Sequence, residues 1–181
     1  TGTSPRDRVA IVRANAKRAE ESLRVLEEFA RGAPEDVRVD ALTVERLRYA
    51  TYDIEKRIVA QLLRTDNSCR VRGLYVIVDA AMARGRDLVA IARDAIGGGA
   101  EVIQYRDKSG ERNRVYQTAS ALNTLCRESS TLFVMNDMAD VAAAIDAPGL
   151  HLGQCDLPVE AARRVVADST IIGVSCHNLE D

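Results

Sequence analysis

Tryptophan is absent from the sequence, and phenylalanine and tyrosine bring the aromatic content to only 4%. So few aromatic rings argue against the stacking platforms on which single-stranded nucleic acids are bound. An excess of basic residues is also absent, since 25 Lys and Arg stand against 27 Asp and Glu. A surface that binds phosphate backbones needs a cationic balance, and we therefore predict no nucleic-acid partner.

Long apolar runs and cysteine motifs are missing as well. No window approaches the roughly 18 uninterrupted apolar residues of a membrane helix, and from the first residues of the sequence we expect no signal peptide. The four cysteines form no C-x-x-C pair, and with two histidines they give no zinc-ligand spacing. Scattered thiols are typical of a reducing compartment. We expect a cytoplasmic protein without a membrane partner, in which any metal is held by oxygen ligands.

The first part of the chain, residues 1–70, reads as helix throughout, and we predict that it forms an all-α N-terminal domain. A first helix is expected to begin near Pro5 and to end at Gly32, because proline suits an early helical position and glycine a C-terminal cap. Its apolar residues recur at spacings of four, three and four, and this face comprises Ala19, Leu23, Leu26 and Ala30. A second helical run over 36–64 carries a similar stripe, which comprises Leu47, Tyr49, Ile54, Ile58 and Leu62. The Arg and Glu residues between the stripes predict a solvated surface with weak ion pairs.

The second part, residues 71–181, alternates short apolar strands with helices. Strands are predicted at residues 74–79, 101–107, 131–136, 149–153 and 170–177, with a helix after each of the first four. This alternation predicts a parallel sheet covered by helices on both faces. Two architectures remain open on this pattern alone. One is a doubly wound open sheet, and the other is a (β/α)₈ barrel of which five strands are present.

Functional side chains gather at the carboxyl ends of the strands in both architectures. Alternation along the second strand places Gln104, Arg106 and, if the strand continues, Lys108 on one face. A guanidinium and an ammonium beside an amide form a receptor for an anion, and pyrophosphate is the natural candidate. The alternative is a solvated strand end at which these charges bind no ligand.

Acidic residues follow the next two strands. The third strand ends in Asn136 and Asp137, and Asp156 lies beyond the fourth strand, after Gly153. Because the two strands are neighbours, Asp137 and Asp156 can share one hard cation such as Mg²⁺, which favours oxygen ligands. The alternative for Asn136 and Asp137 is a turn or a helix cap.

The fifth strand brings Ser175 and His177 onto one face, where Ser175 can donate to a phosphate oxygen through its hydroxyl or its backbone N–H. A serine hydrolase is not expected, because no nucleophile elbow surrounds this serine. His151 lies one position off the face of its apolar neighbours and is interpreted as a structural, hydrogen-bonded histidine. Together these residues predict a Mg²⁺-dependent diphosphate site without a protein nucleophile.

Four ordered segments of the sequence resemble the thiamine-phosphate synthase family, whose members are also called thiamin phosphate pyrophosphorylases. The segments are GLYVIVD (73–79), GGAEVIQYRDKS (98–109), LFVMNDMADVAAAIDAPGLHLGQCDLPVEAAR (132–163) and IIGVSCHN (171–178). They contain the family's Q-x-R-x-K, N-D, H-L-G-Q-x-D and G-V-S-x-H motifs in the family's order. The resemblance implies a TIM-type (β/α)₈ barrel, with five of its eight strands present and an all-α domain before it.

The resemblance also implies a reaction and a role for each matching residue. The family is a Mg²⁺-dependent transferase of thiamine biosynthesis, which joins hydroxymethylpyrimidine diphosphate to thiazole phosphate and releases pyrophosphate. By this resemblance the pyrimidine would meet Gln104, and Mg²⁺ would be carried by Asp137 and Asp156. The diphosphate would be held by Arg106, Lys108, Asn136 and Ser175. The expected partners are therefore small-molecule substrates, and no catalytic side chain is assigned.

The resemblance stops after the fifth strand, where family members continue with a loop that carries a threonine pair and a lysine, and then with a glycine-rich thiazole phosphate site. We therefore expect this chain to be a portion of a longer enzyme that shows no turnover by itself. Residues 13–31 resemble an N-terminal extension found in some members. The helices are expected to pack beside the barrel or to mediate dimerisation, since these synthases tend to be homo-oligomers.

Two other functions are compatible with the sequence. A thiazole tautomerase-like isomerase shares the barrel and would use His177 for proton transfer, but it usually lacks the diphosphate-binding set. A non-catalytic assembly or regulatory protein would act through residues 1–70 and carry a degenerate barrel. The polar and charged residues at the strand ends favour the synthase over the isomerase, whereas the assembly protein would be distinguished by whether the gene continues past Asp181 with the lysine loop.

Overall fold

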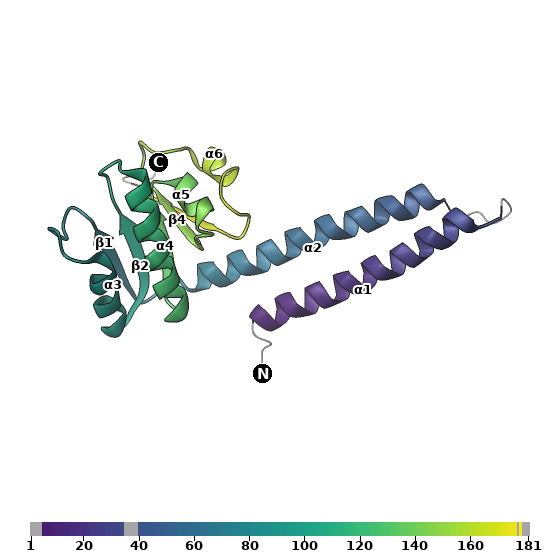
Figure 1. Ribbon diagram of the computed structural model, residues 1–181, viewed down its shortest axis with the longest axis horizontal. Helices are drawn as coiled ribbons and strands as arrows, with labels where there is room; N and C mark the ends of the chain where they lie inside the picture. Colours follow the sequence, from purple (N-terminus) through teal and green to yellow (C-terminus); the bar gives the residue numbers. More distant parts are fainter. Residues whose placement is uncertain (1–4, 35–39, 177, 179–181) are drawn as a thin grey trace. The chain divides into compact units, whose positions relative to one another are not determined.

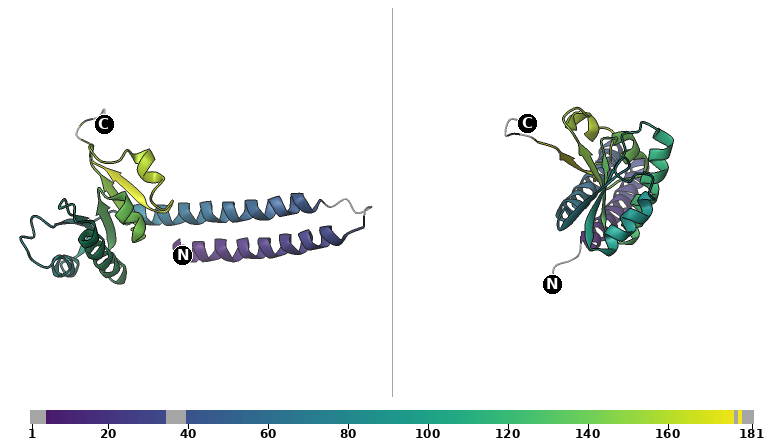
Figure 2. Two further views of the ribbon diagram at one scale, coloured as in Figure 1. Left: turned by 45° about the horizontal axis from the view of Figure 1, so that its top comes forward. Right: turned by 90° about the vertical axis from the view of Figure 1, so that its left-hand side faces the viewer.

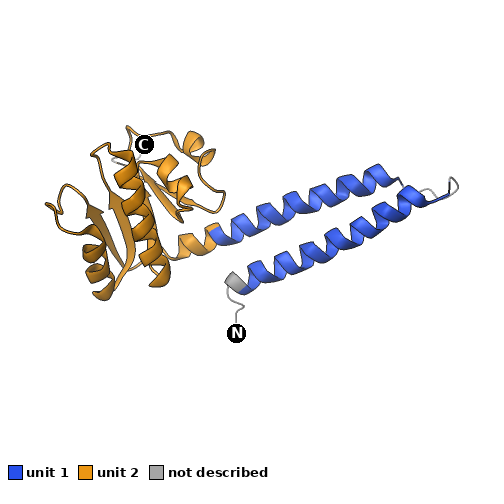
Figure 3. Cartoon of the chain, viewed as in Figure 1, with its two compact units in different colours: residues 1–63 blue, residues 64–181 orange. Residues whose placement is uncertain are grey.

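The computed structural model describes residues 5–34, 40–176 and 178 of the 181-residue chain. The chain divides into two compact units, residues 1–63 and residues 64–181 (Figure 3). The division falls inside a helix, before the change in sequence pattern near residue 70. In the described part of the chain, no helix combines the length and the apolar character that crossing a bilayer requires.

Unit 1 is a helical hairpin. Helix α1 spans Pro5–Gly32 and α2 spans Ala41–Cys69, and the two lie side by side (Figures 1 and 2). The predicted bounds of α1 are confirmed. The second helix continues past its predicted end at residue 64, and its predicted first residues, 36–39, lie outside the described residues.

The inside of the hairpin is unexpectedly polar. Glu27 is only 5% exposed, and its carboxylate accepts hydrogen bonds from Arg31 at 2.5 Å and from Arg48 of α2 at 2.9 Å. Glu20 is buried on the same side of α1, and its Oε1 has no hydrogen-bond partner among the described residues. Exposed ion pairs spaced four residues apart occur as predicted, for example between Lys17 and Glu21 at 3.0 Å. Glu27 departs from that prediction because it is buried and bridges the two helices.

The apolar faces predicted for α1 and α2 exist, but they are not the faces on which the helices meet. Leu26 of α1 is 50% exposed and Ile54 of α2 is 54% exposed. The small apolar interior of the hairpin is formed instead by Val9, Val44 and Val59. The helices therefore meet along a line that is rotated away from their most apolar sides.

Unit 2 follows the predicted alternation of strands and helices. The elements are β1 (Leu74–Asp79), α3 (Leu88–Gly97), β2 (Ala100–Arg106), α4 (Arg112–Glu128), β3 (Leu132–Asn136), α5 (Ala139–Ala144), β4 (Gly149–Leu152), α6 (Val159–Arg163) and β5 (Ile171–Val174). Local signals set the turns between them. Asp87 caps α3 by accepting a hydrogen bond from the Val89 N–H at 2.9 Å, and Gly99 turns the chain into β2 with a φ of 95°, which favours glycine. The fifth strand is shorter than predicted and ends at Val174.

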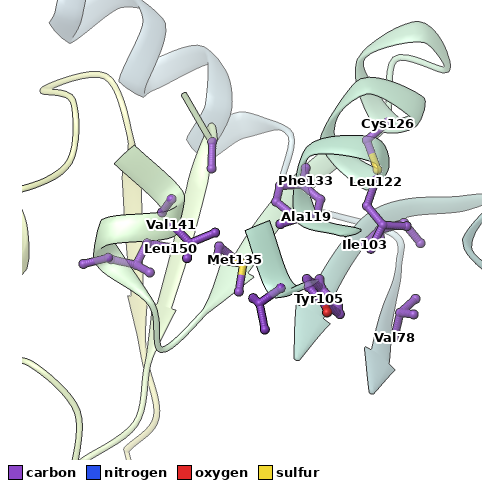
Figure 4. Packing of buried hydrophobic residues seen from close by; sticks show 14 of the residues in the cluster. Val78, Ile103, Tyr105, Ala119, Leu122, Cys126, Phe133, Met135, Val141 and Leu150 are labelled. Carbon is purple, nitrogen blue, oxygen red and sulfur yellow. The ribbon is translucent and has the colours of Figure 1, made fainter. Parts of the chain in front are cut away.

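The five strands are all parallel and lie in the order β1-β2-β3-β4-β5. This order lacks the reversal that defines a doubly wound sheet. Right-handed crossovers between consecutive strands place every helix on the same face. Helices α3 to α6 accordingly share one hydrophobic core with one face of the sheet (Figure 4), to which the strands contribute Val78, Ile103, Tyr105, Phe133, Met135, Leu150 and Leu152.

The expectation that helices cover both faces of the sheet is wrong. On the face opposite the helices, Ile77 is 54% exposed and Tyr75 is also exposed. Towards the start of the strands this face carries a small apolar cluster formed by Val102, Leu132 and Val134. Polar side chains replace apolar ones towards the carboxyl ends, and this is where the candidate site lies.

The last turns of α2 belong to unit 2 and contact the loops at the opposite end of the sheet. Arg64 Nε donates to the Asp168 carbonyl at 2.8 Å, in the segment before β5. Arg70 Nη2 donates to the Thr131 carbonyl at 3.1 Å, in the segment before β3. These two hydrogen bonds attach the end of α2 to the sheet.

Candidate functional site

A cleft of about 500 Å³ lies at the carboxyl-end side of the sheet, on the face without helices. All seven residues predicted for the site line this cleft: Gln104, Arg106, Lys108, Asn136, Asp137, Asp156 and Ser175. Lys108 does so although β2 ends at Arg106. The cleft is also lined by Tyr75, Ile77, His151 and Gly153. Side chains of β1 to β4, together with residues that follow β2, β3, β4 and β5, therefore face one volume.

Arg106 is held by an acidic partner on the neighbouring strand. Asp79 and Arg106 are paired in the register of β1 and β2, and Arg106 Nη1 donates to Asp79 Oδ2. Burial raises the pKa of Asp79, but the hydrogen bonds from Arg106 and from the N–H groups of Met82 and Ala81 outweigh it and lower the pKa. Asp79 therefore stays ionised. Because a guanidinium has five N–H donors, Arg106 keeps several for an anion in the cleft.

A chain of hydrogen bonds fixes the two amides of the site. The Tyr75 hydroxyl donates to Gln104 Oε1 at 2.6 Å, and Gln104 Nε2 donates to Asn136 Oδ1 at 2.5 Å. Both amide side chains are buried, and burial also raises the pKa of Tyr75. With its oxygen occupied in this way, Asn136 presents its Nδ2 group as the donor for a ligand.

The two carboxylates of the cleft lie within hydrogen-bonding reach of each other. Asp137 follows β3 with a φ of 64°, in the left-handed region that aspartate tolerates. Burial raises the pKa of Asp137, the neighbouring Asp156 raises it further, and Lys108 opposes both. The Lys108 Nζ lies 3.4 Å from Asp137 Oδ2. Asp156 is itself oriented by the Gly153 N–H, which donates to its Oδ2 at 2.7 Å.

This carboxylate pair fits a hard divalent cation. Burial and the neighbouring Asp156 together raise the pKa of Asp137, and a cation bound between the two carboxylates would favour their charged forms. Among residues 5–34, 40–176 and 178, no group of three or more His, Cys, Asp and Glu side chains is arranged to hold a metal ion. A cation at this pair would therefore need further oxygen ligands, such as water or phosphate oxygens, as Mg²⁺ commonly has.

His151 is a residue of the cleft that the sequence interpretation did not include. Its Nε2 lies 2.9 Å from Ser175 Oγ, so the histidine is hydrogen-bonded as expected, but it lines the site. A Cβ added to Gly173 would lie 3.1 Å from His151 Nδ1, so glycine leaves room for the ring. The Ser175 backbone N–H donates to the Leu152 carbonyl at 3.0 Å, which leaves the hydroxyl as the group that can reach a ligand. His177 lies outside the described residues.

Tyr75 and Asp79 were also not assigned to the site from the sequence. In β1, Tyr75 and Asp79 lie on the same side of the strand as Ile77, because side chains alternate between the two sides. This is the side of β1 that faces the cleft. The signal that could have found them is this alternation, combined with knowledge of which face the helices leave open.

Two family models match the chain in separate segments. The family described as thiamine monophosphate synthase matches residues 74–181, and the ThiD2 family matches residues 2–57. The first match covers all of the strands and the whole cleft. The second covers most of the helical hairpin.

Individual relatives agree with the first family. The thiamine-phosphate synthase of Synechococcus sp. (strain WH7803) is 41% identical over 176 residues, which cover 96% of this chain and 49% of that protein. The thiamine-phosphate synthase of Persephonella marina (strain DSM 14350 / EX-H1) is 44% identical over 108 residues, which cover 60% of this chain and 52% of that protein.

A solved structure, thiamine phosphate pyrophosphorylase from Pyrococcus furiosus, matches with a TM-score of 0.54 and 40% identity over 59% of this chain and 51% of that chain. The chain spans about half the length of the curated relatives it matches. With the cleft, the sequential parallel sheet and these matches together, the chain belongs to the thiamine monophosphate synthase family.

Proposed function

We propose that this chain is part of a thiamine-phosphate synthase, a transferase that joins hydroxymethylpyrimidine diphosphate to thiazole phosphate and releases pyrophosphate. The observation that carries the proposal is the cleft itself, where the cations Arg106 and Lys108 face the carboxylates Asp137 and Asp156. Such a set suits a diphosphate together with a divalent cation. The names of the relatives support the same reaction.

The proposed roles follow from the donors and acceptors that each side chain has left. The anionic oxygens of the diphosphate are bound by Arg106, Lys108, the Nδ2 group of Asn136 and the hydroxyl of Ser175. The pyrimidine lies against Gln104, whose amide is held by Tyr75. Asp79 acts as a positioning residue that orients the guanidinium of Arg106.

The proposed reaction breaks the bond between the pyrimidine methylene carbon and a diphosphate oxygen, and it forms a bond from that carbon to the thiazole nitrogen. The electron pair of the broken bond leaves with pyrophosphate, so negative charge grows at the leaving group. The side chains of Arg106 and Lys108 stabilise that charge, and the walls of the cleft align the two substrates. Asp137 and Asp156 would hold Mg²⁺, which would supply further positive charge to the leaving group. The reaction demands no acid–base side chain.

We also propose that unit 2 forms the first five strands of a TIM-type barrel, that the chain is a portion of a longer enzyme, and that it shows no turnover alone. The sequential strand order and the exposed side chains of Tyr75 and Ile77 on the face away from the helices support this arrangement. The exposed and free thiols of Cys69, Cys155 and Cys176 support a cytoplasmic location.

The test uses the protein at its natural length with both substrates and Mg²⁺. Thiamine phosphate is measured by chromatography after oxidation to its fluorescent derivative, and pyrophosphate by a coupled assay. One pyrophosphate is expected per thiamine phosphate, and Arg106→Ala is expected to lower kcat/KM by about 100-fold or more. The matched control is Arg112→Ala, whose guanidinium binds the exposed Asp140 side chain and does not line the cleft among the described residues.

Two results would contradict the proposal. One is the absence of thiamine phosphate when both substrates are shown to bind. The other is thiazole isomerisation without pyrophosphate release that survives Arg106→Ala, which would favour the tautomerase-like isomerase.

A further inference from the structure

Asp107 is a buried carboxylate that the reaction proposed above does not use. It follows β2, lies in the sequence between the two cleft cations Arg106 and Lys108, and is only 5% exposed. The alternation of β2 continues through this segment. Asp107 therefore points with Tyr105 to the side of the helices, whereas Arg106 and Lys108 line the cleft. Because a buried carboxylate is costly unless donors surround it, its presence here needs an explanation.

Three donors hold this carboxylate in place. The hydroxyl of Tyr105, itself fully buried, donates to Asp107 Oδ2 at 3.1 Å, and Arg114 Nη2 of α4 lies 3.5 Å from the same oxygen. The backbone N–H of Ser109 donates to Asp107 Oδ1 at 2.8 Å. Burial raises the pKa of Asp107, but the hydrogen bonds from Ser109 and Tyr105 and the charge of Arg114 outweigh it and lower the pKa. Asp107 is therefore ionised, and both of its oxygens have partners.

The hydrogen bond from Ser109 closes a turn around Lys108. An aspartate whose side chain accepts the N–H two residues later forms an Asx turn, which sets the direction of the backbone at the residue between them. Lys108 is this middle residue. Its backbone is therefore attached to the buried side of the sheet although β2 ends at Arg106, while its Nζ lies in the cleft, 3.4 Å from Asp137 Oδ2.

We propose that Asp107 is a positioning residue for Lys108, because its carboxylate fixes the turn over residues 107–109 and thereby directs the ammonium of Lys108 at the diphosphate. The inference rests on the proposed function, since it requires that Lys108 bind the diphosphate. The lysine side chain is flexible and 59% exposed, so a fixed backbone reduces the conformational entropy that it loses on binding an anion. Each cation of the cleft is then set by a carboxylate of its own, Arg106 by Asp79 and Lys108 by Asp107.

The test measures the binding of inorganic pyrophosphate with Mg²⁺ to the protein at its natural length, by isothermal titration calorimetry. Lys108→Ala and Asp107→Ala are each expected to weaken this binding about 10-fold. Asp107→Asn keeps an acceptor for the Ser109 N–H and is expected to bind within about 3-fold of the natural protein. In a protein that already carries Lys108→Ala, Asp107→Ala is expected to weaken binding by less than about 2-fold, because a positioning residue acts only through the group that it positions.

Two further variants separate positioning from a loss of stability. Ser109→Pro removes the N–H that closes the turn, at an exposed position, and is expected to weaken binding as Asp107→Ala does, so it serves if Asp107→Ala fails to fold. Leu122→Ala is the matched control, because Leu122 is a core residue of α4 outside this turn. It is expected to lower stability but to bind pyrophosphate with the affinity of the natural protein.

The outcomes distinguish this inference from the proposed function. Natural affinity in Asp107→Ala or Ser109→Pro beside a clear loss in Lys108→Ala would overturn the inference and leave the proposed function intact. An equal loss in Leu122→Ala, or a further loss of about 10-fold when Asp107→Ala is added to Lys108→Ala, would also overturn the inference. If Lys108→Ala itself binds pyrophosphate like the natural protein, the proposed role of Lys108 fails and the inference fails with it.

Discussion

Replacing Asp137 by asparagine is expected to stabilise the ligand-free protein while it removes the cation site. Burial and the nearby Asp156 raise the pKa of Asp137, so the folded state disfavours its charged form. For a carboxyl with a raised folded pKa, folding is favoured at low pH, and this contribution is lost as the pH rises through the unfolded and then the folded pKa. At neutral pH the natural protein therefore carries a penalty that Asp137→Asn lacks.

The size of the effect follows from the surroundings of the pair. Two unit charges about 4 Å apart repel each other by about 4 kcal/mol at an effective dielectric constant of 20. Lys108, whose Nζ lies 3.4 Å from Asp137 Oδ2, offsets much of this, and solvent screens part of the rest. A net gain of about 1 kcal/mol remains, which corresponds to a rise in Tm of about 3 °C for a protein of this size.

Thermal unfolding followed by circular dichroism at neutral and acidic pH measures this gain. The Tm of Asp137→Asn is expected to exceed that of the natural protein at neutral pH, and the difference is expected to vanish in acid, where Asp137 is protonated. Mg²⁺ with inorganic pyrophosphate is expected to raise the Tm of the natural protein but not of the variant. Asp140→Asn, an exposed aspartate bound to Arg112, is the control and is expected to change stability by less than about 0.5 kcal/mol. A lower Tm for Asp137→Asn at neutral pH, or an equal difference at both pH values, would refute the reasoning.

Three further changes have defined outcomes. Arg106→Lys keeps a positive charge but loses the planar fork, so calorimetry is expected to show about 10-fold weaker binding of pyrophosphate with Mg²⁺, and equal affinity would contradict the anion role. Tyr75→Phe leaves the buried Gln104 Oε1 without its donor and is expected to lower the free energy of unfolding in urea by about 1–2 kcal/mol, whereas no loss would show that the amide chain is not formed. Leu122→Ala creates a cavity beneath α4 and is expected to lower the same quantity by about 3 kcal/mol, and a loss below about 1 kcal/mol would contradict its place in the core.

The strand-end residues could be predicted because alternation along a strand is a local property. Arg106 and Gln104 share a parity in β2, and chain order brings the end of β3, with Asn136, beside them. The shared parity within β2 needs no knowledge of the rest of the fold, whereas the place of β3 beside it depends on the strand order. Alternation accounts for Gln104, Arg106 and Asn136 in this way, and the other four predicted residues of the cleft lie just beyond the strand ends.

The other residues of the cleft depend on which face of the sheet is open, and this is a property of the whole topology. In β4, His151 points to the face opposite Leu150, which packs in the core under the helices. This position lies in a cleft only because the helices cover one face of the sheet and leave the other open. An apolar run such as that of β1 gives no sign of which of Tyr75 and Val76 faces a ligand. The sequential strand order decides the question, and it is visible only in three dimensions.

The hairpin shows the same limit for helices. The spacing of Leu23 and Leu26 correctly defines an apolar face, but the line along which α1 meets α2 is set by residues far apart in sequence. Glu27 and Arg48 are 21 positions apart and form the buried bond between the helices. Periodicity within one helix carries no information about such a pair.

The attachment of α2 to the sheet has a practical consequence for dividing the protein. The sequence pattern changes near residue 70, which suggests beginning a shortened protein there. Such a protein would lack Arg64, and the backbone carbonyl of Asp168 would lose its side-chain donor. Its new N-terminus would also lie at Arg70, whose guanidinium donates to the Thr131 carbonyl, so the helix that holds this arginine in place would be missing. Anyone who wishes to express the sheet-bearing half separately should keep the final turns of this helix and begin the shortened protein upstream of residue 64.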